Sequence, residues 1–381
     1  MKKTLIASAV LLASGAVFAQ ASITGSFIYG YKATTSAKAN NPQAAGMGVD
    51  TSEIDLAVKE DLGGGQTVEA KMAFAGADRS GESTSTAGNG NVKGRDASLT
   101  YTNSSIGQFK FSTAEGGDYF NAIATVGAPV IEMDGKLHET KSSSDHASYT
   151  VPVGPTYFNV DFGEPSAGMG LGAGMQGTAN PGKDQRNITY SLYYPAGSLT
   201  VLGAYRNYNN RQDGACQAGA TSMAQCPAIY ATKNDLLNLQ MAYDFGVAKL
   251  GLGYQSVAAT NGITQLDTMI AVSVPMGAWT IGAAWSQSKL SNAPDTTNFV
   301  FGTWDARKYE GSAYGASYGV SYAFSKRTSV TLKYATWNHS GYSQYEADAA
   351  ANAIAYSGNG AGGLSYNRNA NEGSLLLSHT F

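Results

Sequence analysis

The chain has 381 residues, of which 46 are glycine and 23 are tyrosine, and only 14% are charged. Its 25 basic and 28 acidic residues give a net charge of −3, which argues against a nucleic-acid partner. Apolar residues are spread thinly along the chain, so after the N-terminus no segment resembles a membrane-spanning helix and no stretch supplies a large soluble core.

The N-terminus has the pattern of a secretory signal peptide. Lys2 and Lys3 precede a mostly apolar stretch at 5–18, and Val17-Phe18-Ala19 fits a small-x-small cleavage site. A transmembrane anchor is the weaker alternative because the apolar stretch is short. We therefore expect residues 1–19 to be removed, leaving residues 20–381 as one exported domain with 23 basic and 28 acidic residues.

Most of the mature chain alternates apolar and polar side chains. This alternation is clear at residues 23–32, 53–59, 67–74 and 314–324. A period of two indicates strands with one apolar face. Between the second and third of these strands lies EDLGGG at 60–65, whose glycines suit a tight turn that needs positive φ.

The connections between strands alternate strictly in length. Long polar segments lie near 33–50, 76–94, 116–146, 163–185, 209–232, 259–265, 290–309 and 340–371. Short turns lie near 61–65, 103–107, 153–155, 195–197, 245–247, 275–278 and 324–327. These eight long and seven short connections join 16 strands, and long loops at one end with short turns at the other are typical of outer-membrane barrels.

The composition of the polar faces indicates whether the apolar side chains point into the barrel or outward. They carry Ser, Gly, Thr and charged residues, which cannot fill a dry core, so the apolar faces should contact lipid and the polar faces water. A barrel of this size leaves an aqueous lumen. We therefore predict an all-β fold, a 16-stranded antiparallel transmembrane β-barrel in the outer membrane of a Gram-negative bacterium.

One long segment, Gly116–His146, breaks the alternation with Pro129 and several glycines. We predict that this third long loop folds into the barrel and narrows the pore; an ordinary exposed loop is the alternative. Its charged residues are Asp118, Glu132, Asp134, Glu139 and Asp145 against Lys136 and Lys141. Of these, we assign Asp118, Glu132, Asp134 and Glu139 to the constriction.

Charged residues on the polar faces of the early strands are the candidates for the pore wall. They are Lys32, Glu53, Asp55, Lys59, Glu69, Lys71, Arg95, Asp96 and Lys110. Aromatic residues cluster near strand ends and suit interfacial girdles, with scattered surface aromatics as the alternative. The girdle candidates are Tyr29, Tyr31, Tyr193, Tyr194, Phe245, Trp279, Tyr322 and Phe324.

The two cysteines, Cys216 and Cys226, lie in one polar stretch, and in an exported protein we expect a disulfide between them. A metal site there is the less favoured interpretation, because no histidine lies nearby. His138 and His146 with Glu139 do not have a diagnostic metal spacing. We predict no metal and no cofactor.

Two other function classes compete with a channel. An outer-membrane hydrolase would need a nucleophile and a base on one face, but Ser378 and His379 are adjacent on a strand and point to opposite faces. No G-x-S-x-G elbow is present in a strand-to-helix context, because GASYG at 315–319 lies within the alternating strand at 314–324. We therefore predict no enzymatic activity. A structural or adhesive barrel would have a plugged or narrow lumen, whereas the inward-facing charges favour a wetted one.

Several motifs, in order along the chain, resemble the trimeric general porins of β-proteobacteria. They are FIYGY at 27–31, EDLGGG at 60–65, RDASLTY at 95–101, IGQFKF at 106–111, SYAFSKRTSVTLKYATWN at 321–338 and the terminal SHTF. The resemblance implies a 16-stranded barrel, a homotrimer, a third loop folded into the lumen, and passive diffusion of ions and small hydrophilic solutes. As partners it implies outer-membrane lipid and lipopolysaccharide.

The chain departs from this family on the barrel wall that faces the third loop. Where the family usually has arginines, this sequence has Glu53 and Thr113, while Arg95 matches a family arginine. The basic wall is thinned, and we predict weak cation selectivity or none.

Overall fold

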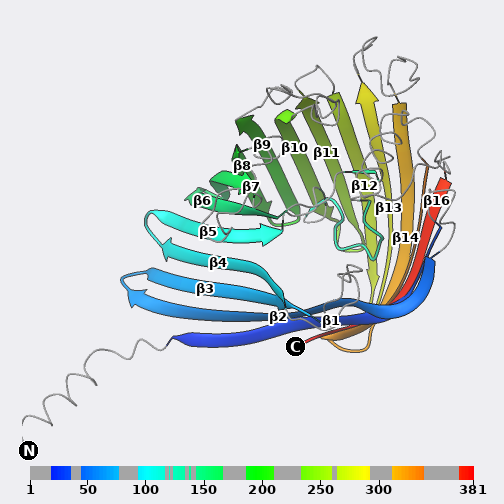
Figure 1. Ribbon diagram of the computed structural model, residues 1–381, viewed down its shortest axis with the longest axis horizontal. Helices are drawn as coiled ribbons and strands as arrows, with labels where there is room; N and C mark the ends of the chain where they lie inside the picture. Colours follow the sequence, from blue (N-terminus) through cyan, green and yellow to red (C-terminus); the bar gives the residue numbers. More distant parts are fainter. Residues whose placement is uncertain are drawn as a thin grey trace, which may run out of the picture.

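A computed structural model describes residues 19–35, 44–76, 93–115, 120, 123–133, 137–138, 143–165, 186–209, 233–259, 264–291, 311–338 and 369–381. Within these residues the chain forms 16 strands that close into one antiparallel barrel (Figure 1). The predicted fold class is confirmed. The predicted signal peptide and both cysteines lie outside the described residues.

The strands follow one another around the barrel in chain order. Their bounds are β1 Gln20–Thr35, β2 Ala44–Gly63, β3 Gln66–Ala75, β4 Lys93–Asn103, β5 Gly107–Glu115, β6 Ser143–Val153, β7 Thr156–Pro165, β8 Arg186–Ala196, β9 Leu199–Asn209, β10 Lys233–Asp244, β11 Lys249–Ala259, β12 Thr264–Met276, β13 Trp279–Ser291, β14 Gly311–Ala323, β15 Thr328–Asn338 and β16 Asn369–Thr380. Among these residues no helix is long and apolar enough to cross a membrane.

The barrel closes between the two ends of the chain. β1 pairs with β16 from Ser26 opposite Thr380 to Thr35 opposite Asn371. Beyond this ladder, Gly25 and Phe381 exchange backbone hydrogen bonds of 3.1 Å in both directions. No strand edge is left open at this seam, as a barrel in lipid requires.

Strands β1 and β2 reach further than the sequence predicted. The first long connection was expected at 33–50, but β1 continues to Thr35 and β2 begins at Ala44. Backbone pairing from Ala33 opposite Ala45 continues the ladder, with a bulge that lets the strand bend near Asp50. Residues at these ends are polar or small, so hydrophobic alternation does not reveal the strand there.

The outward face is apolar and exposed. Leu252, Trp285 and Leu332 are examples, and their exposure marks the surface that contacts lipid. Near the short turns, outward aromatic side chains contact one another, as Trp279 does with Tyr322 at a ring-centroid distance of 4.7 Å. Aromatic residues at this level are typical of a membrane-interface girdle.

Tyr193 is an exception among the predicted girdle residues. It pairs directly with Tyr157 on one side and Leu202 on the other, and Leu202 pairs with Gln240. Paired residues in an antiparallel sheet share a face. Because Gln240 bonds to a segment inside the barrel, described below, Tyr193 faces the lumen.

Candidate functional site

The described part of the segment between β5 and β6 lies inside the barrel, where Figure 1 shows its cyan trace beside β12. We call the described part of it, residues 120, 123–133 and 137–138, the inner segment. It is held in tight turns: Val126 has a positive φ of 50°, the next residue is Gly127, and Ala128 N donates to Thr125 O over 2.9 Å. Positive φ is uncommon outside glycine, so this turn depends on its surroundings to hold it.

Glycines on the lumenal face of the wall allow the inner segment to approach the strands. A Cβ at Gly319 of β14 would collide with the backbone oxygen of Pro129, and one at Gly251 of β11 with that of Ala124. A Cβ at Gly282 of β13 would lie 2.7 Å from the Ala128 side chain. The wall is therefore shaped to receive this backbone.

Two hydrogen bonds fix the position of the inner segment on the wall. Ile131 N donates to Ser317 Oγ over 2.6 Å, and Ala124 N donates to Gln240 Oε1 over 3.3 Å. Both contacts are buried, where backbone donors need a partner. They tie the segment to β14 and β10.

Apolar side chains of the inner segment form a dry core against the wall. One cluster is Phe120, Ala124, Val130, Met269, Ala271 and Ala284, and a second is Ile131, Met133, Leu137, Ala313, Ala335, Trp337 and Ala370. Sequence reasoning concentrated on the acids of this segment and missed these anchors. The apolar run at 128–131 was the available signal, since an exposed loop rarely carries one.

A chain of polar side chains runs along the wall next to these contacts. Gln240 donates to Asn238, Asn238 to Gln255 and Gln255 to the carboxylate of Asp267, over 2.9, 3.0 and 3.2 Å. Asp267 also accepts from Gln265 over 3.1 Å. Asp267 is fully buried, and these amide donors are what makes a carboxylate tolerable there.

The wall from β1 to β5 carries the predicted charged residues, and several of them are paired. Lys32 lies 3.1 Å from Glu372 of β16, Lys71 lies 3.7 Å from Asp55, and Arg95 Nη1 lies 2.7 Å from Glu53 Oε2. The register aligns Lys59 with Glu69 on β2 and β3, and Lys110 with Thr100 on β5 and β4. Several acids and bases of this wall thus lie side by side.

A bulge explains how Arg95 reaches Glu53. Pairing of β3 with β4 shifts between Met72 and Phe74, so that Arg95 and Asp96 together oppose the single residue Ala73. A bulge re-aims a side chain. The small Ala73 lies on the strand between the two partners, so the guanidinium spans from β4 to β2.

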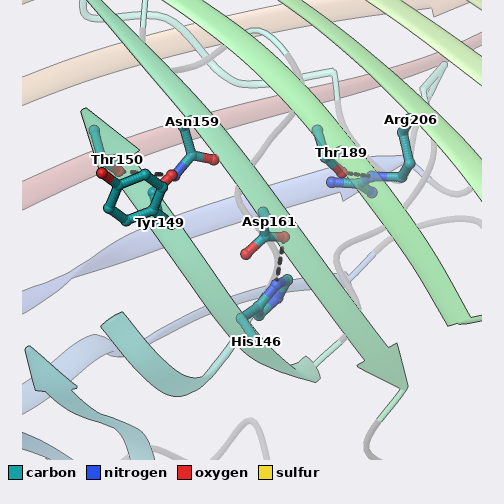
Figure 2. Close-up of polar contacts among 7 residues, drawn as sticks. All are labelled: His146, Tyr149, Thr150, Asn159, Asp161, Thr189 and Arg206. Atoms are coloured by element: carbon teal, nitrogen blue, oxygen red, sulfur yellow. Dashed lines mark hydrogen bonds and ion pairs between the residues drawn. The ribbon is translucent and has the colours of Figure 1, made fainter. Parts of the chain in front are cut away.

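Strands β6 to β9 carry a second polar surface in the lumen, shown in Figure 2. His146 Nδ1 and Asp161 Oδ2 lie 2.9 Å apart, and Arg206 Nε donates to Thr189 Oγ1 over 2.8 Å. His146 thus has a carboxylate partner on β7. Among the described residues no group of three or more His, Cys, Asp or Glu side chains could hold a metal ion.

Of the predicted constriction acids, only Glu132 is described, and its side chain is exposed. Asp118, Asp134 and Glu139 lie outside the described residues. Asp145 is not in a loop, because β6 begins at Ser143. It lies opposite Thr113, whose hydroxyl donates to its carboxylate, on the face opposite to that of His146. The two-residue period of the strand turns Asp145 away from the lumen.

The family model of the Gram-negative porins matches residues 6–342. The chain belongs to the Gram-negative porin family. No curated protein matches it. Porins of this family form channels in the outer membrane, and this one is an outer-membrane porin for passive diffusion.

Solved structures of outer-membrane proteins share the porin fold. OmpT of Vibrio cholerae, in its trimer form, superposes with a TM-score of 0.58 at 12% identity, covering 95% of this chain and 99% of that one. A triple mutant of the Rhodopseudomonas blastica porin gives a TM-score of 0.55 at 13% identity, with coverage of 95% and 100%. At this identity the likeness establishes the fold alone.

Proposed function

We propose that this porin passes ions and small hydrophilic solutes through a zone narrowed by the third loop, with weak cation selectivity or none. One observation carries the selectivity: the family-type arginine of the wall, Arg95, is neutralised by Glu53 at 2.7 Å. Two further bases, Lys32 and Lys71, each lie within 4 Å of an acid. An ion close to such a pair meets two opposed charges, whose effects largely cancel.

The constriction residues are part of the same proposal. The inner segment occupies lumen beside β10 to β15, which leaves the water-filled path along the charged wall of β1 to β5. Glu132 is on the exposed side of the segment. We assign it, with Asp118, Asp134 and Glu139, to the acidic side of the narrow zone, facing the mixed wall. This arrangement favours cations slightly, as acidic rings do in other pores.

The reversal potential of the purified protein in a planar bilayer under a KCl gradient tests this proposal. We expect a value near zero or slightly on the cation side, which decreases as salt shortens the Debye length. Glu53→Arg should move the reversal potential to the anion side. Strong anion selectivity in the unmodified protein, or no effect of this substitution, would contradict the proposal.

We also propose that the barrel forms a homotrimer whose outward faces contact neighbouring subunits, outer-membrane lipid and lipopolysaccharide. The support is the apolar outward surface of the barrel and the structural likeness to a porin described in trimer form. A mass measurement in mild detergent tests the oligomer. A stable monomer would count against it.

We further propose that the channel has no catalytic activity and that its N-terminal signal peptide is removed. Ester and peptide substrates should be recovered unchanged after incubation with the purified protein. Hydrolysis that a single point substitution in the protein abolishes would contradict this expectation. N-terminal sequencing of the mature protein should begin at Gln20. Retention of residues 1–19 would reject the predicted cleavage.

A further inference from the structure

An apolar row crosses the lumenal wall near the short-turn end of the barrel. The register places Pro152 of β6 opposite Tyr157 of β7, Tyr157 opposite Tyr193 of β8, and Tyr193 opposite Leu202 of β9. Leu202 in turn pairs with Gln240, which bonds to the inner segment and so fixes this face as lumenal. None of these four side chains in the row is charged, whereas the wall of β1 to β5 is built from charged pairs.

The two tyrosines of this row stay open to the lumen. Tyr157 is 45% exposed and Tyr193 is 38% exposed, and their ring centroids lie 6.3 Å apart with the planes tilted by 34°. Inside a water-filled pore, an aromatic pair with this exposure leaves apolar surface wet. A solute with a matching apolar face would cover it and release that water.

Hydrogen-bonding groups follow one step further along the same strands. Asn159 and Ser191 form the next pair above the tyrosines, at a two-residue step of about 6.6 Å. Asn159 Nδ2 donates to Thr150 Oγ1 over 2.8 Å, which holds the amide in place (Figure 2). A solute resting on the tyrosine rings therefore meets neutral amide and hydroxyl groups at its edge.

The third row contains one acid and one base, Asp161 and Arg206, whose formal charges are opposite. Asp161 pairs with Thr189, and Thr189 with Arg206. The Asp161 carboxylate already contacts His146, and Arg206 already donates to Thr189 (Figure 2). The side chains of Asp161, Thr189 and Arg206 therefore offer hydrogen bonds to a solute, and their two opposite charges produce no strong net field.

We propose that Tyr157 and Tyr193 form a binding platform for neutral saccharides in the lumen. A pyranose ring has one face of C–H groups and an edge of hydroxyls, so it fits an aromatic surface bordered by amide and hydroxyl side chains. A planar cation would need a carboxylate in the first row, where the register places Pro152 and Leu202. The platform makes diffusion of such solutes saturable. This inference rests on the proposed function as an open channel.

Ion current through the protein in a planar bilayer, with the neutral trisaccharide raffinose added, tests the platform. We expect a saturable decrease in current that exceeds the decrease caused by a polyethylene glycol of the same hydrodynamic size. Tyr157→Ala and Tyr193→Ala should each weaken the raffinose binding constant by roughly 2- to 10-fold. The conservative Tyr157→Phe should retain it, because the ring face carries the contact.

Tyr190→Ala is the matched control, since Tyr190 lies on the same strand and alternates to the lipid face, where it is 44% exposed. This substitution should leave raffinose binding unchanged. A raffinose effect equal to that of the polymer, or saturable block that is unaffected by both lumenal alanine variants, would overturn the platform while leaving the channel intact. Absence of stepwise conductance in the unmodified protein would reject the open channel and the platform with it.

Discussion

Arg95 and Glu53 form an ion pair across an intervening strand, with 2.7 Å between Nη1 and Oε2. The side chains are 37% and 22% exposed, so water screens the pair and its contribution to folding stability is about 0–1 kcal/mol. Its larger consequence is electrostatic. The one wall arginine that matches the family pattern has a carboxylate beside it.

Glu53→Gln should therefore make the pore more anion-selective. The substitution keeps a hydrogen-bond acceptor for Arg95 but removes the negative charge of Glu53, so less of the guanidinium charge is compensated when an ion passes. A change of about 1 kcal/mol in ion energy alters relative permeability several-fold. The measurement is the reversal potential under a KCl gradient at low and high salt, where the difference should decrease at high salt.

Glu60→Gln serves as the control for this change. Glu60 is on the same strand, pairs with Val68 and alternates to the outward face. Removing its charge should leave the reversal potential within error of the unmodified protein. Equal shifts for both substitutions would mean that the selectivity depends on net charge and not on the wall at Arg95.

The sequence predicted the barrel well because its signals are local. Alternation and turn glycines report the face and the end of each strand without any knowledge of tertiary contacts. Alternation alone places the wall charges Lys32, Asp55 and Lys71 on the lumenal side, and their role in the pore wall stays a prediction. The ion pairs Lys32–Glu372 and Lys71–Asp55 show that each pair shares one face of the sheet. Alternation no longer predicts the face of a residue where a β-bulge inserts an extra residue into a strand. The approach of Arg95 to Glu53 across Ala73 could therefore not be derived from the sequence.

The path of the inner segment was beyond sequence reasoning for a different reason. Its position depends on glycines in strands far along the chain, such as Gly251 and Gly319, which look like ordinary small residues in a strand. Only the three-dimensional arrangement shows that Ala124 and Pro129 approach them. The lumenal orientation of Tyr193 was missed because an aromatic near a strand end fits a girdle equally well.

Gly319→Ala should displace the inner segment and change single-channel conductance. The added methyl group would overlap the Pro129 backbone, and overpacking of this kind costs about 1–3 kcal/mol unless the segment moves. We expect a stable barrel with altered or fluctuating conductance. Gly203→Ala is the control, because its Cβ would lie 3.5 Å from Leu239, an ordinary contact. Identical conductance in both variants would show that Gly319 does not position the segment.

The cysteine pair gives a chemical prediction. If Cys216 and Cys226 are joined, no thiol should react with a thiol reagent in the unfolded, unreduced protein, and two should react after reduction. The disulfide closes a short loop, so it should contribute at most about 2–3 kcal/mol, and only locally. Replacing both residues with serine should leave conductance unchanged. Two reactive thiols before reduction would refute the pairing.

Asp267→Asn should weaken the barrel although it changes few atoms. Asp267 is fully buried and accepts from Gln255 and Gln265, both of which present amide N–H groups to its two carboxylate oxygens. The asparagine amide would turn an NH₂ group toward one of these donors, leaving a buried donor without an acceptor at a cost of about 1–3 kcal/mol.

Because unfolding of such barrels in detergent need not be reversible, the appropriate measurement is the unfolding rate at a fixed high temperature, followed by the change in gel mobility. We expect faster unfolding for Asp267→Asn and no change for Asp50→Asn, since Asp50 is exposed at the β2 bulge. Equal unfolding rates for the two variants would mean that the amide network does not depend on the Asp267 carboxylate.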